Sequence, residues 1–200
     1  MRIAVLASGS GSNLQAILDR AGDPAYPADI VLVASDRPGA RALERAEAVG
    51  VPTAVVPWDG DRVGFTHAVC EVVADAGAEG IVLAGFMRIL SAEAVDRFPD
   101  RILNIHPSLL PAFPGGRAVE DALAHGVAVT GVTVHFVDEQ VDHGPIIAQR
   151  AVPVRADDTV ESLHARIQLV EHELYPDVVA EFAAGRLVVE GRHVHRKEAE

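Results

Sequence analysis

The 200-residue chain predicts an α/β fold, a three-layer sandwich in which helices cover both faces of a mostly parallel, mixed central sheet. In the first half, short runs that are apolar on both faces alternate with helical patterns, as in a parallel sheet covered on both sides. In the second half, one strand alternates apolar and polar residues, and a short loop joins it to the next strand, which favours antiparallel pairing. Hydrophobic residues make up 49% of the chain, enough for the core of one compact domain.

The first half contains four expected strands separated by three expected helices. Apolar runs without polar alternation predict strands at residues 2–7, 29–35, 53–56 and 80–84. Apolar residues at helical spacing, or an alanine-rich composition, predict helices at residues 13–21, 40–49 and 62–76. This alternation is Rossmann-like, and such sheets bind ligands outside the carboxyl ends of their strands.

The second half continues the sheet with three more expected strands, at residues 101–105, 129–137 and 146–154. A proline-rich loop and a short helix at residues 119–125 follow the first of these strands. A long helix is expected at residues 157–185, with Asp157 or Asp158 as its N-cap. We expect a single domain over residues 1–190 and a charged tail with little fixed structure over residues 191–200.

Composition and charge argue against several classes of protein. The formal net charge of −12 disfavours nucleic acid and anionic membrane surfaces as partners. A single cysteine excludes an intrachain disulfide and a cysteine-built zinc site. No apolar run reaches the ~18 residues of a membrane span, and the N-terminus lacks a signal-peptide pattern. We therefore expect a cytoplasmic protein without a metal site.

The glycine loop, residues 9–13 with the sequence GSGSN, follows the first expected strand and opens a helix. A helix N-terminus offers free N–H groups and a positive dipole end, which suit a phosphate or a carboxylate. Gly9 and Gly11 would allow close approach of the backbone; the alternative is a plain turn capped by Ser12. A dinucleotide site is disfavoured because Leu14 occupies the third glycine position of the motif, although Asp36 stands where a ribose-binding acid would.

A second candidate site lies at the end of the strand expected at residues 101–105. A period of two places Asn104 and His106 on one side, where the amide could donate to an oxyanion and the imidazole could transfer protons. Asp142 could keep the imidazole charged if the two meet. A structural histidine and a turn-forming aspartate are the alternatives. Thr133 and His135 share one face of the strand at 129–137 and are expected to support these residues.

Four segments in order carry a resemblance to a known family: SGSGSNLQAI near the N-terminus, LAGFMRILS at 83–91, RILNIHPSLLPAFPG at 101–115 and HFVDEQVDHGPIIAQ at 135–149. Over residues 1–187 the chain resembles the phosphoribosylglycinamide formyltransferases (glycinamide ribonucleotide transformylases). The resemblance implies the formyltransferase fold and an enzyme of purine synthesis. It implies transfer of a formyl group from the co-substrate 10-formyltetrahydrofolate to the amine of glycinamide ribonucleotide, without a metal.

The resemblance also implies roles for particular residues. The catalytic residues would be Asn104, His106 and Asp142. The ribonucleotide would be bound by Gly11, Ser12, Asn13, Glu171, His172, Glu173 and Leu174. The folate would be bound by Arg62, Met87, Arg88, Ile89, Leu90, Asn104, Asp138, Glu139, Gln140, Val141 and Asp142. Residues 115–119 lack a histidine that the family usually carries near this point, so this stretch is assigned no catalytic role.

Two further classes of function stay open at this point. A 10-formyltetrahydrofolate hydrolase or another folate-dependent formyltransferase would use the same catalytic residues, although these relatives normally carry additional domains. A noncatalytic nucleotide-binding module would use only the glycine loop and would leave Asn104, His106 and Asp142 unexplained. In each case the expected partners are small molecules, and the chain is expected to be a monomer or a homodimer.

Overall fold

The central sheet of the computed structural model, which describes residues 1–197, contains seven strands in the order β3-β2-β1-β4-β5-β6-β7. Their bounds are β1 Arg2–Leu6, β2 Asp29–Ser35, β3 Thr53–Val55, β4 Gly80–Leu83, β5 Ile102–His106, β6 Val129–Phe136 and β7 Ile146–Pro153. Strands β1 to β5 pair in parallel, whereas β6 and β7 pair antiparallel. The prediction of a mostly parallel, mixed sheet is confirmed.

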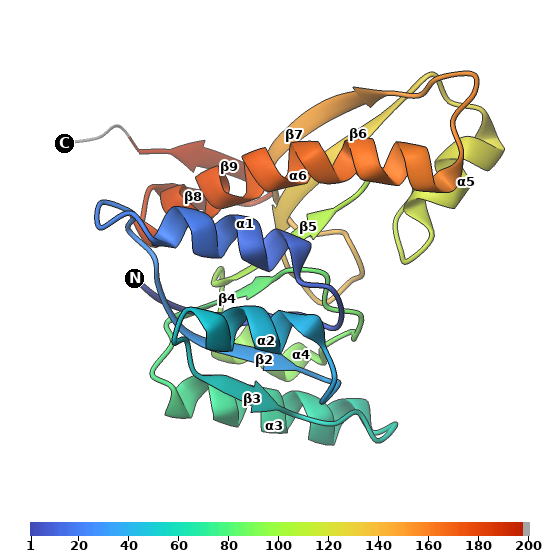
Figure 1. The fold of residues 1–200 in the computed structure, drawn as a ribbon. Helices are drawn as coiled ribbons and strands as arrows, with labels where there is room; N and C mark the ends of the chain where they lie inside the picture. Colours follow the sequence, from blue (N-terminus) through green and yellow to red (C-terminus); the bar gives the residue numbers. More distant parts are fainter. Residues whose placement is uncertain (198–200) are drawn as a thin grey trace.

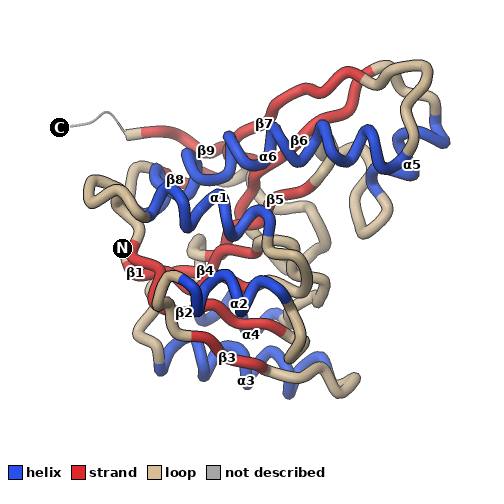
Figure 2. Tube along the Cα trace, viewed as in Figure 1, coloured by secondary structure: helices blue, strands red, loops and turns tan. Residues whose placement is uncertain are grey.

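Helices cover both faces of this sheet, as Figures 1 and 2 show. They are α1 Ser12–Ala21, α2 Arg41–Ala48, α3 Arg62–Asp75, α4 Ala92–Arg97, α5 Ala118–His125 and α6 Val160–Ala183. The apolar faces of α1, α2 and α6 share one buried cluster, whereas α3 and α4 pack in a second cluster on the other face. Because side chains alternate along a strand, Ile3 and Val5 of β1 enter the first cluster and Ala4 and Leu6 enter the second.

The loops that follow β1 and β4 lie together at the carboxyl edge of the parallel strands. The Ser8 amide donates to the Gly85 carbonyl at 3.1 Å, and the Ser8 hydroxyl accepts from the Met87 amide at 2.8 Å. The strand order reverses at β1, with β2 on one side and β4 on the other. Open α/β sheets bind their ligands at such a reversal, so these bonds tie the glycine loop to the residues expected to hold the folate.

The C-terminal segment differs from the expected tail. Residues 187–190 form β8 (Leu187–Glu190), which pairs antiparallel with β9 (His193–Arg196) in a separate two-stranded sheet. Val189 and Val194 also pack against the main core. These apolar contacts stabilise the hairpin, although most of its neighbouring residues are charged. An unstructured tail from residue 191 is therefore wrong for residues 193–196, and residues 198–200 lie outside the described part of the chain.

Two helix boundaries also correct the sequence analysis. The N-cap of α6 is Thr159, whose hydroxyl accepts from the Ser162 amide at 3.2 Å while the Ser162 hydroxyl accepts from the Thr159 amide at 3.0 Å. Asp158, one of the two expected caps, instead forms an ion pair with Arg166. Helix α4 was not expected from the sequence, since it has only six residues. No helix within residues 1–197 has the length and apolar character needed to cross a bilayer.

Candidate active site

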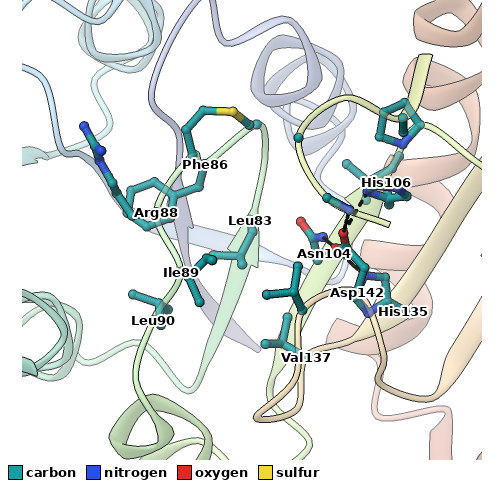
Figure 3. Close-up of a pocket in the computed structure, with 18 of the residues that line it drawn as sticks. Leu83, Phe86, Arg88, Ile89, Leu90, Asn104, His106, His135, Val137 and Asp142 are labelled. Carbon is teal, nitrogen blue, oxygen red and sulfur yellow. Dashed lines mark hydrogen bonds and ion pairs between the residues drawn. The ribbon is translucent and has the colours of Figure 1, made fainter. Parts of the chain in front are cut away.

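Four polar side chains share one face of the sheet where β5 and β6 pair. The register places Asn104 opposite His135 and His106 opposite Thr133. Their chain neighbours, such as Leu103 in β5, point to the other face and join the core. The period of two therefore brings the predicted pairs together, and Figure 3 shows Asn104, His106 and His135 gathered at one side of a pocket.

Asp142 reaches this group from the loop between β6 and β7. Its Oδ2 lies 3.3 Å from Nδ1 of His106 and accepts a 2.7 Å hydrogen bond from the Gly115 amide. Its Oδ1 lies 3.7 Å from Nε2 of His135 and 3.4 Å from Nδ2 of Asn104. Asp142 adopts a left-handed backbone, with φ of 52°, which is uncommon for a residue other than glycine. This strained turn aims its carboxylate at the strand ends.

The surroundings of Asp142 favour its ionised form. Burial alone would raise the pKa of Asp142, but the nearby imidazoles of His135 and His106, together with the hydrogen bond from the Gly115 amide, hold it below its usual range. The carboxylate therefore stays negative at neutral pH while it faces two imidazole rings.

Both ring nitrogens of His106 face oxygen acceptors. Nδ1 faces the Asp142 carboxylate, and Nε2 lies 2.8 Å from the carbonyl oxygen of Phe113. Neither a carboxylate nor a carbonyl can donate, so the arrangement suits a ring that carries protons on both nitrogens. Each ring nitrogen of His106 thus has an oxygen within reach, one on the loop between β6 and β7 and one on the loop that follows β5.

His135 fixes the orientation of the Asn104 amide. Nδ1 of His135 lies 2.7 Å from the Phe136 carbonyl and must donate to it, which leaves Nε2 of the neutral ring as an acceptor. Nδ2 of Asn104 lies 3.2 Å from this Nε2 and 3.4 Å from Asp142. The Asn104 amide thus donates to both His135 and Asp142, and the longer hydrogen bond, to Asp142, is the weaker of the two.

Thr133 supports the site through the loop that follows β5. Its hydroxyl donates to the Ser108 carbonyl at 2.7 Å and accepts from the Leu110 amide at 3.0 Å. Gln149 of β7 donates to the same hydroxyl at 2.9 Å. Thr133 therefore holds the segment that carries the Phe113 carbonyl onto His106, rather than touching the imidazole through a hydrogen bond.

A cavity of about 490 Å³ opens beside these residues. Its lining includes every residue expected to bind folate except Arg62, namely Met87, Arg88, Ile89, Leu90, Asn104, Asp138, Glu139, Gln140, Val141 and Asp142. Figure 3 places Phe86, Ile89 and Leu90 across the pocket from Asn104 and Asp142. The walls are therefore apolar on one side and polar on the other, a lining that suits an aromatic ligand with hydrogen-bonding edges.

Two arginines make contacts that the sequence did not predict. Arg62 donates from its guanidinium to the Leu90 carbonyl, so it supports a wall of the cavity without lining it. Arg88 lines the cavity, but its Nε donates to the buried Asp36 at 2.6 Å and its guanidinium lies 5.0 Å from the centre of the Trp58 ring. Asp36 is thus paired with Arg88, which disfavours the ribose-binding alternative considered for it.

The glycine loop meets α6 through a buried pair. Nδ2 of Asn13 donates to Oε2 of Glu171 at 2.9 Å, and the two residues are 8% and 5% exposed. Burial raises the pKa of Glu171 above its usual range, although the hydrogen bond from Asn13 and the charges of His164 and His106 act in the opposite direction. Glu171 is therefore buried against the glycine loop and is not part of a solvated helix face.

The remaining expected ribonucleotide residues of α6 lie in different surroundings. Glu173 is exposed and pairs with Arg150 of β7, at 3.4 Å, and Leu174 packs in the core. Glu173 is two positions after Glu171, about 200° around the helix, whereas Leu174 is three positions after it and lies near the same side of the helix. His172 is half-buried; burial lowers the pKa of its imidazole, and the nearby charge of Arg45 lowers it further.

Gly11 is required by packing more than by a ligand. It is the N-cap of α1 with φ of 69°, and a Cβ at this position would stand 2.8 Å from Cα of Ala42 in α2. A side chain would therefore clash with the backbone of a neighbouring helix and strain its own backbone. Capping by Ser12, the alternative considered for this loop, is wrong, since α1 begins at Ser12 and its N-cap is Gly11.

Several residues of the site were missed by sequence analysis. The Gly115 amide and the Phe113 carbonyl contribute backbone groups, which residue types cannot reveal. His164 and Glu120 line the cavity from α6 and α5, close to Val119 in the stretch that lacks the expected histidine. The seven-residue spacing from His164 to Glu171, two helical turns, is a signal that could have placed both on one face.

Residues 1–179 match the model of the family described as formyl transferase. The chain therefore belongs to the formyl transferase family. Within residues 1–197, no group of three or more His, Cys, Asp or Glu side chains is arranged to hold a metal ion.

Among its relatives, the chain is 43% identical to the phosphoribosylglycinamide formyltransferase of Bacillus subtilis (strain 168) over 180 residues, which cover 89% of this chain and 92% of that protein. The crystal structure of glycinamide ribonucleotide transformylase 1 from Symbiobacterium toebii superposes with a TM-score of 0.96 at 50% identity and covers 99% of this chain and 94% of that one.

Two other similar proteins differ from these relatives in length or in the activity that their names state. The trifunctional purine biosynthetic protein adenosine-3 of Bos taurus is 47% identical over 96% of this chain, but the chain spans only 19% of that protein. A formyltetrahydrofolate deformylase from Pseudomonas syringae has a TM-score of 0.92 at 28% identity and covers 98% of this chain and 66% of that one. The fold alone is therefore shared by a transferase and a deformylase.

Proposed function

We propose that this formyl transferase moves the formyl group of 10-formyltetrahydrofolate to the amine of glycinamide ribonucleotide, a step of purine biosynthesis. The observation that carries the proposal is the meeting of His106 and Asp142 at 3.3 Å, beside Asn104, in the wall of the cavity. The cavity offers an apolar wall for the ring system of the folate. The glycine loop, on the same edge of the sheet, offers free amides for the phosphate of the ribonucleotide.

The chemistry is direct attack of the amine on the formyl carbon. Attack forms the new carbon–nitrogen bond, and the carbonyl electron pair moves to the oxygen to give a tetrahedral oxyanion. Asn104 donates to this oxygen by exchanging its long, 3.4 Å contact with Asp142. Collapse of the oxyanion breaks the bond between the formyl carbon and the folate nitrogen.

Proton transfer follows the same balance. The folate nitrogen gains one proton as it leaves, and the attacking amine loses one, which restores the proton that the His106 imidazole supplies. His106, held as an imidazolium between Asp142 and the Phe113 carbonyl, stabilises the oxyanion and supplies the proton to the leaving nitrogen. Asp142 keeps His106 charged and oriented. Holding the two substrates together in attack geometry supplies a further large part of the acceleration.

Hydrolysis is the competing function, because a deformylase shares the fold. The buried pair of Asn13 and Glu171 beside the glycine loop favours transfer, since a second substrate needs a second binding region and water does not. A cytoplasmic location and a monomeric or homodimeric state stay predictions from the sequence.

The test is to incubate the protein with 10-formyltetrahydrofolate and follow loss of the formyl group with and without glycinamide ribonucleotide. Transfer requires deformylation only when the amine is present. Deformylation without the amine would make the protein a hydrolase, and no turnover in either case would favour a binding module. Asp142→Asn is the matched control, since it should abolish most turnover without altering the fold of the sheet.

A further inference from the structure

The carbonyl groups of the glycine loop are all engaged by the protein, whereas its amides are not. The Gly9 carbonyl accepts from the Ala42 amide at 3.1 Å, the Ser10 carbonyl accepts from Arg45 at 2.8 Å, and the Gly11 carbonyl accepts from the Gln15 amide at 2.8 Å. Within residues 1–197, the amides of residues 11–13 make no hydrogen bond to another residue. Turning carbonyls inward and amides outward creates a concave group of donors that suits an anion.

Arg45 of α2 is the side chain that holds this arrangement. Its Nε donates to the Ser10 carbonyl at 2.8 Å, and its Nη1 donates to the side-chain oxygen of Gln15 at 2.7 Å. The guanidinium thus ties the loop to the first turns of α1. Its charge also contributes to lowering the pKa of His172 on α6, so it acts on both elements that border the loop.

The charge balance at the loop calls for a cation. A helix N-terminus carries about half an elementary charge, and a phosphate ester carries up to two negative charges near neutral pH. Burial and Arg45 both lower the pKa of His172, which favours its neutral form. Glu171, on the other side of Asn13, offers a carboxyl group. In the described part of the chain, Arg45 is the cationic side chain that hydrogen-bonds to the glycine loop.

We propose that Arg45 is a positioning residue for phosphate binding: it holds the Ser10 carbonyl away from the ligand and adds a full positive charge beside the loop amides. The proposal rests on the proposed function in taking the ligand to be the phosphate of the ribonucleotide. Arg45 acts through the loop and not on the formyl group, so its removal affects ribonucleotide binding and leaves the chemical step and folate binding intact.

The test measures inorganic phosphate binding by calorimetry and steady-state kinetics in Arg45→Gln, Arg45→Lys and Arg41→Gln. Arg41 lies in the first turn of the same helix and is exposed, so Arg41→Gln removes an equal charge without touching the loop. Arg45→Gln should raise the Kd for phosphate and the KM for the ribonucleotide roughly tenfold, the scale of one charge-assisted hydrogen bond. The KM for folate and kcat should change less than about twofold. Arg45→Lys should recover part of the lost phosphate affinity, because lysine keeps the positive charge but cannot donate to Ser10 and Gln15 with the planar geometry of a guanidinium.

Unchanged phosphate binding in Arg45→Gln, or an equal loss in Arg41→Gln, would overturn the proposal. If Arg45→Gln unfolds at assay temperature, Arg45→Lys is compared with the wild type instead. An unchanged phosphate Kd and an unchanged KM for the ribonucleotide in Arg45→Lys would then contradict a role for the two hydrogen bonds of the guanidinium. Added salt should reduce the difference in phosphate Kd between the wild type and Arg45→Gln, because the Arg45 guanidinium is partly exposed to solvent. Phosphate calorimetry needs no turnover, so a wild-type protein that binds phosphate through Arg45 without transferring formyl would contradict only the proposed function.

Discussion

The imidazole of His106 and the carboxylate of Asp142 approach to 3.3 Å, and their side chains are only 6% and 10% exposed. A charge interaction at a site so little exposed to water is screened weakly by solvent and salt. Two further donors reach the carboxylate, the Gly115 amide at 2.7 Å and Asn104 at 3.4 Å. The carboxylate is therefore held ionised by its surroundings and is free to stabilise positive charge on the ring.

Asp142→Asn should lower kcat by roughly 10²–10⁴, the range for loss of acid–base catalysis. Asparagine keeps the size of the side chain but removes the charge that favours protonation of His106. The basic limb of the kcat–pH profile should move to lower pH, and acidifying the assay should recover part of the rate. A variant with the same basic limb as the wild type would return Asp142 to the role of a turn residue.

Asn104→Ala should lower kcat by about 10²–10³ with a small effect on the KM for either substrate, because the oxyanion exists only after attack. Steady-state kinetics with each substrate varied in turn separates the two constants. A rise in the KM for folate at unchanged kcat would show that Asn104 only positions the folate.

Thr133→Val should destabilise the protein by about 1–3 kcal/mol, because the Leu110 amide and the Ser108 carbonyl lose a buried partner. The loop that delivers the Phe113 carbonyl to His106 would loosen, so kcat should fall as well. Thr130→Val is the matched control on the same strand, since the buried Thr130 hydroxyl has no hydrogen-bond partner in residues 1–197. Denaturant unfolding of both variants checks this, and equal losses would contradict the assigned role of Thr133.

Glu171→Gln should stabilise the free protein at alkaline pH by about 1 kcal/mol. Burial raises the pKa of Glu171 in the folded state, so the folded chain binds a proton more readily than the unfolded chain. Stability then falls as pH rises from the unfolded-state value of ~4.3 through the raised folded-state value. The glutamine amide can also donate to Oδ1 of Asn13, which is buried without a partner among the described residues.

Thermal unfolding at pH 4 and pH 8 checks the prediction for Glu171. The variant should gain in Tm over the wild type at pH 8 and match it at pH 4. Glu173→Gln, at an exposed neighbour, should show no such dependence on pH. A Glu171→Gln variant that loses Tm at pH 8 but not at pH 4 would mean that Glu171 is needed structurally in its ionised form.

Periodicity was sufficient to predict the strand residues of the site. A period of two placed Asn104 with His106 and Thr133 with His135, and strand pairing then set these pairs opposite one another. Periodicity could not place Asp142, because its left-handed backbone depends on the conformation of the loop and not on its own residue type. The family resemblance supplied Asp142 where spacing alone left a turn residue as the better interpretation.

The misses have local physical causes. The six residues of α4 are too few for a helical period, and β8 and β9 are stabilised by a core that lies far away in sequence. Leu174 lies three residues after Glu171, on nearly the same side of α6, and its residue type alone does not show that it packs in the core. Arg62 was placed by resemblance, and only the fold shows that its guanidinium reaches the Leu90 carbonyl.

The most direct test of formyl transfer uses 10-formyltetrahydrofolate labelled with ¹³C in the formyl group, with product analysis by NMR and mass spectrometry after incubation with glycinamide ribonucleotide. The account predicts that the label appears as an N-formyl group on the ribonucleotide amine, in equal amount to the tetrahydrofolate released, and that Asp142→Asn slows both together. Label recovered as free formate, at a rate that does not depend on the ribonucleotide, would contradict it.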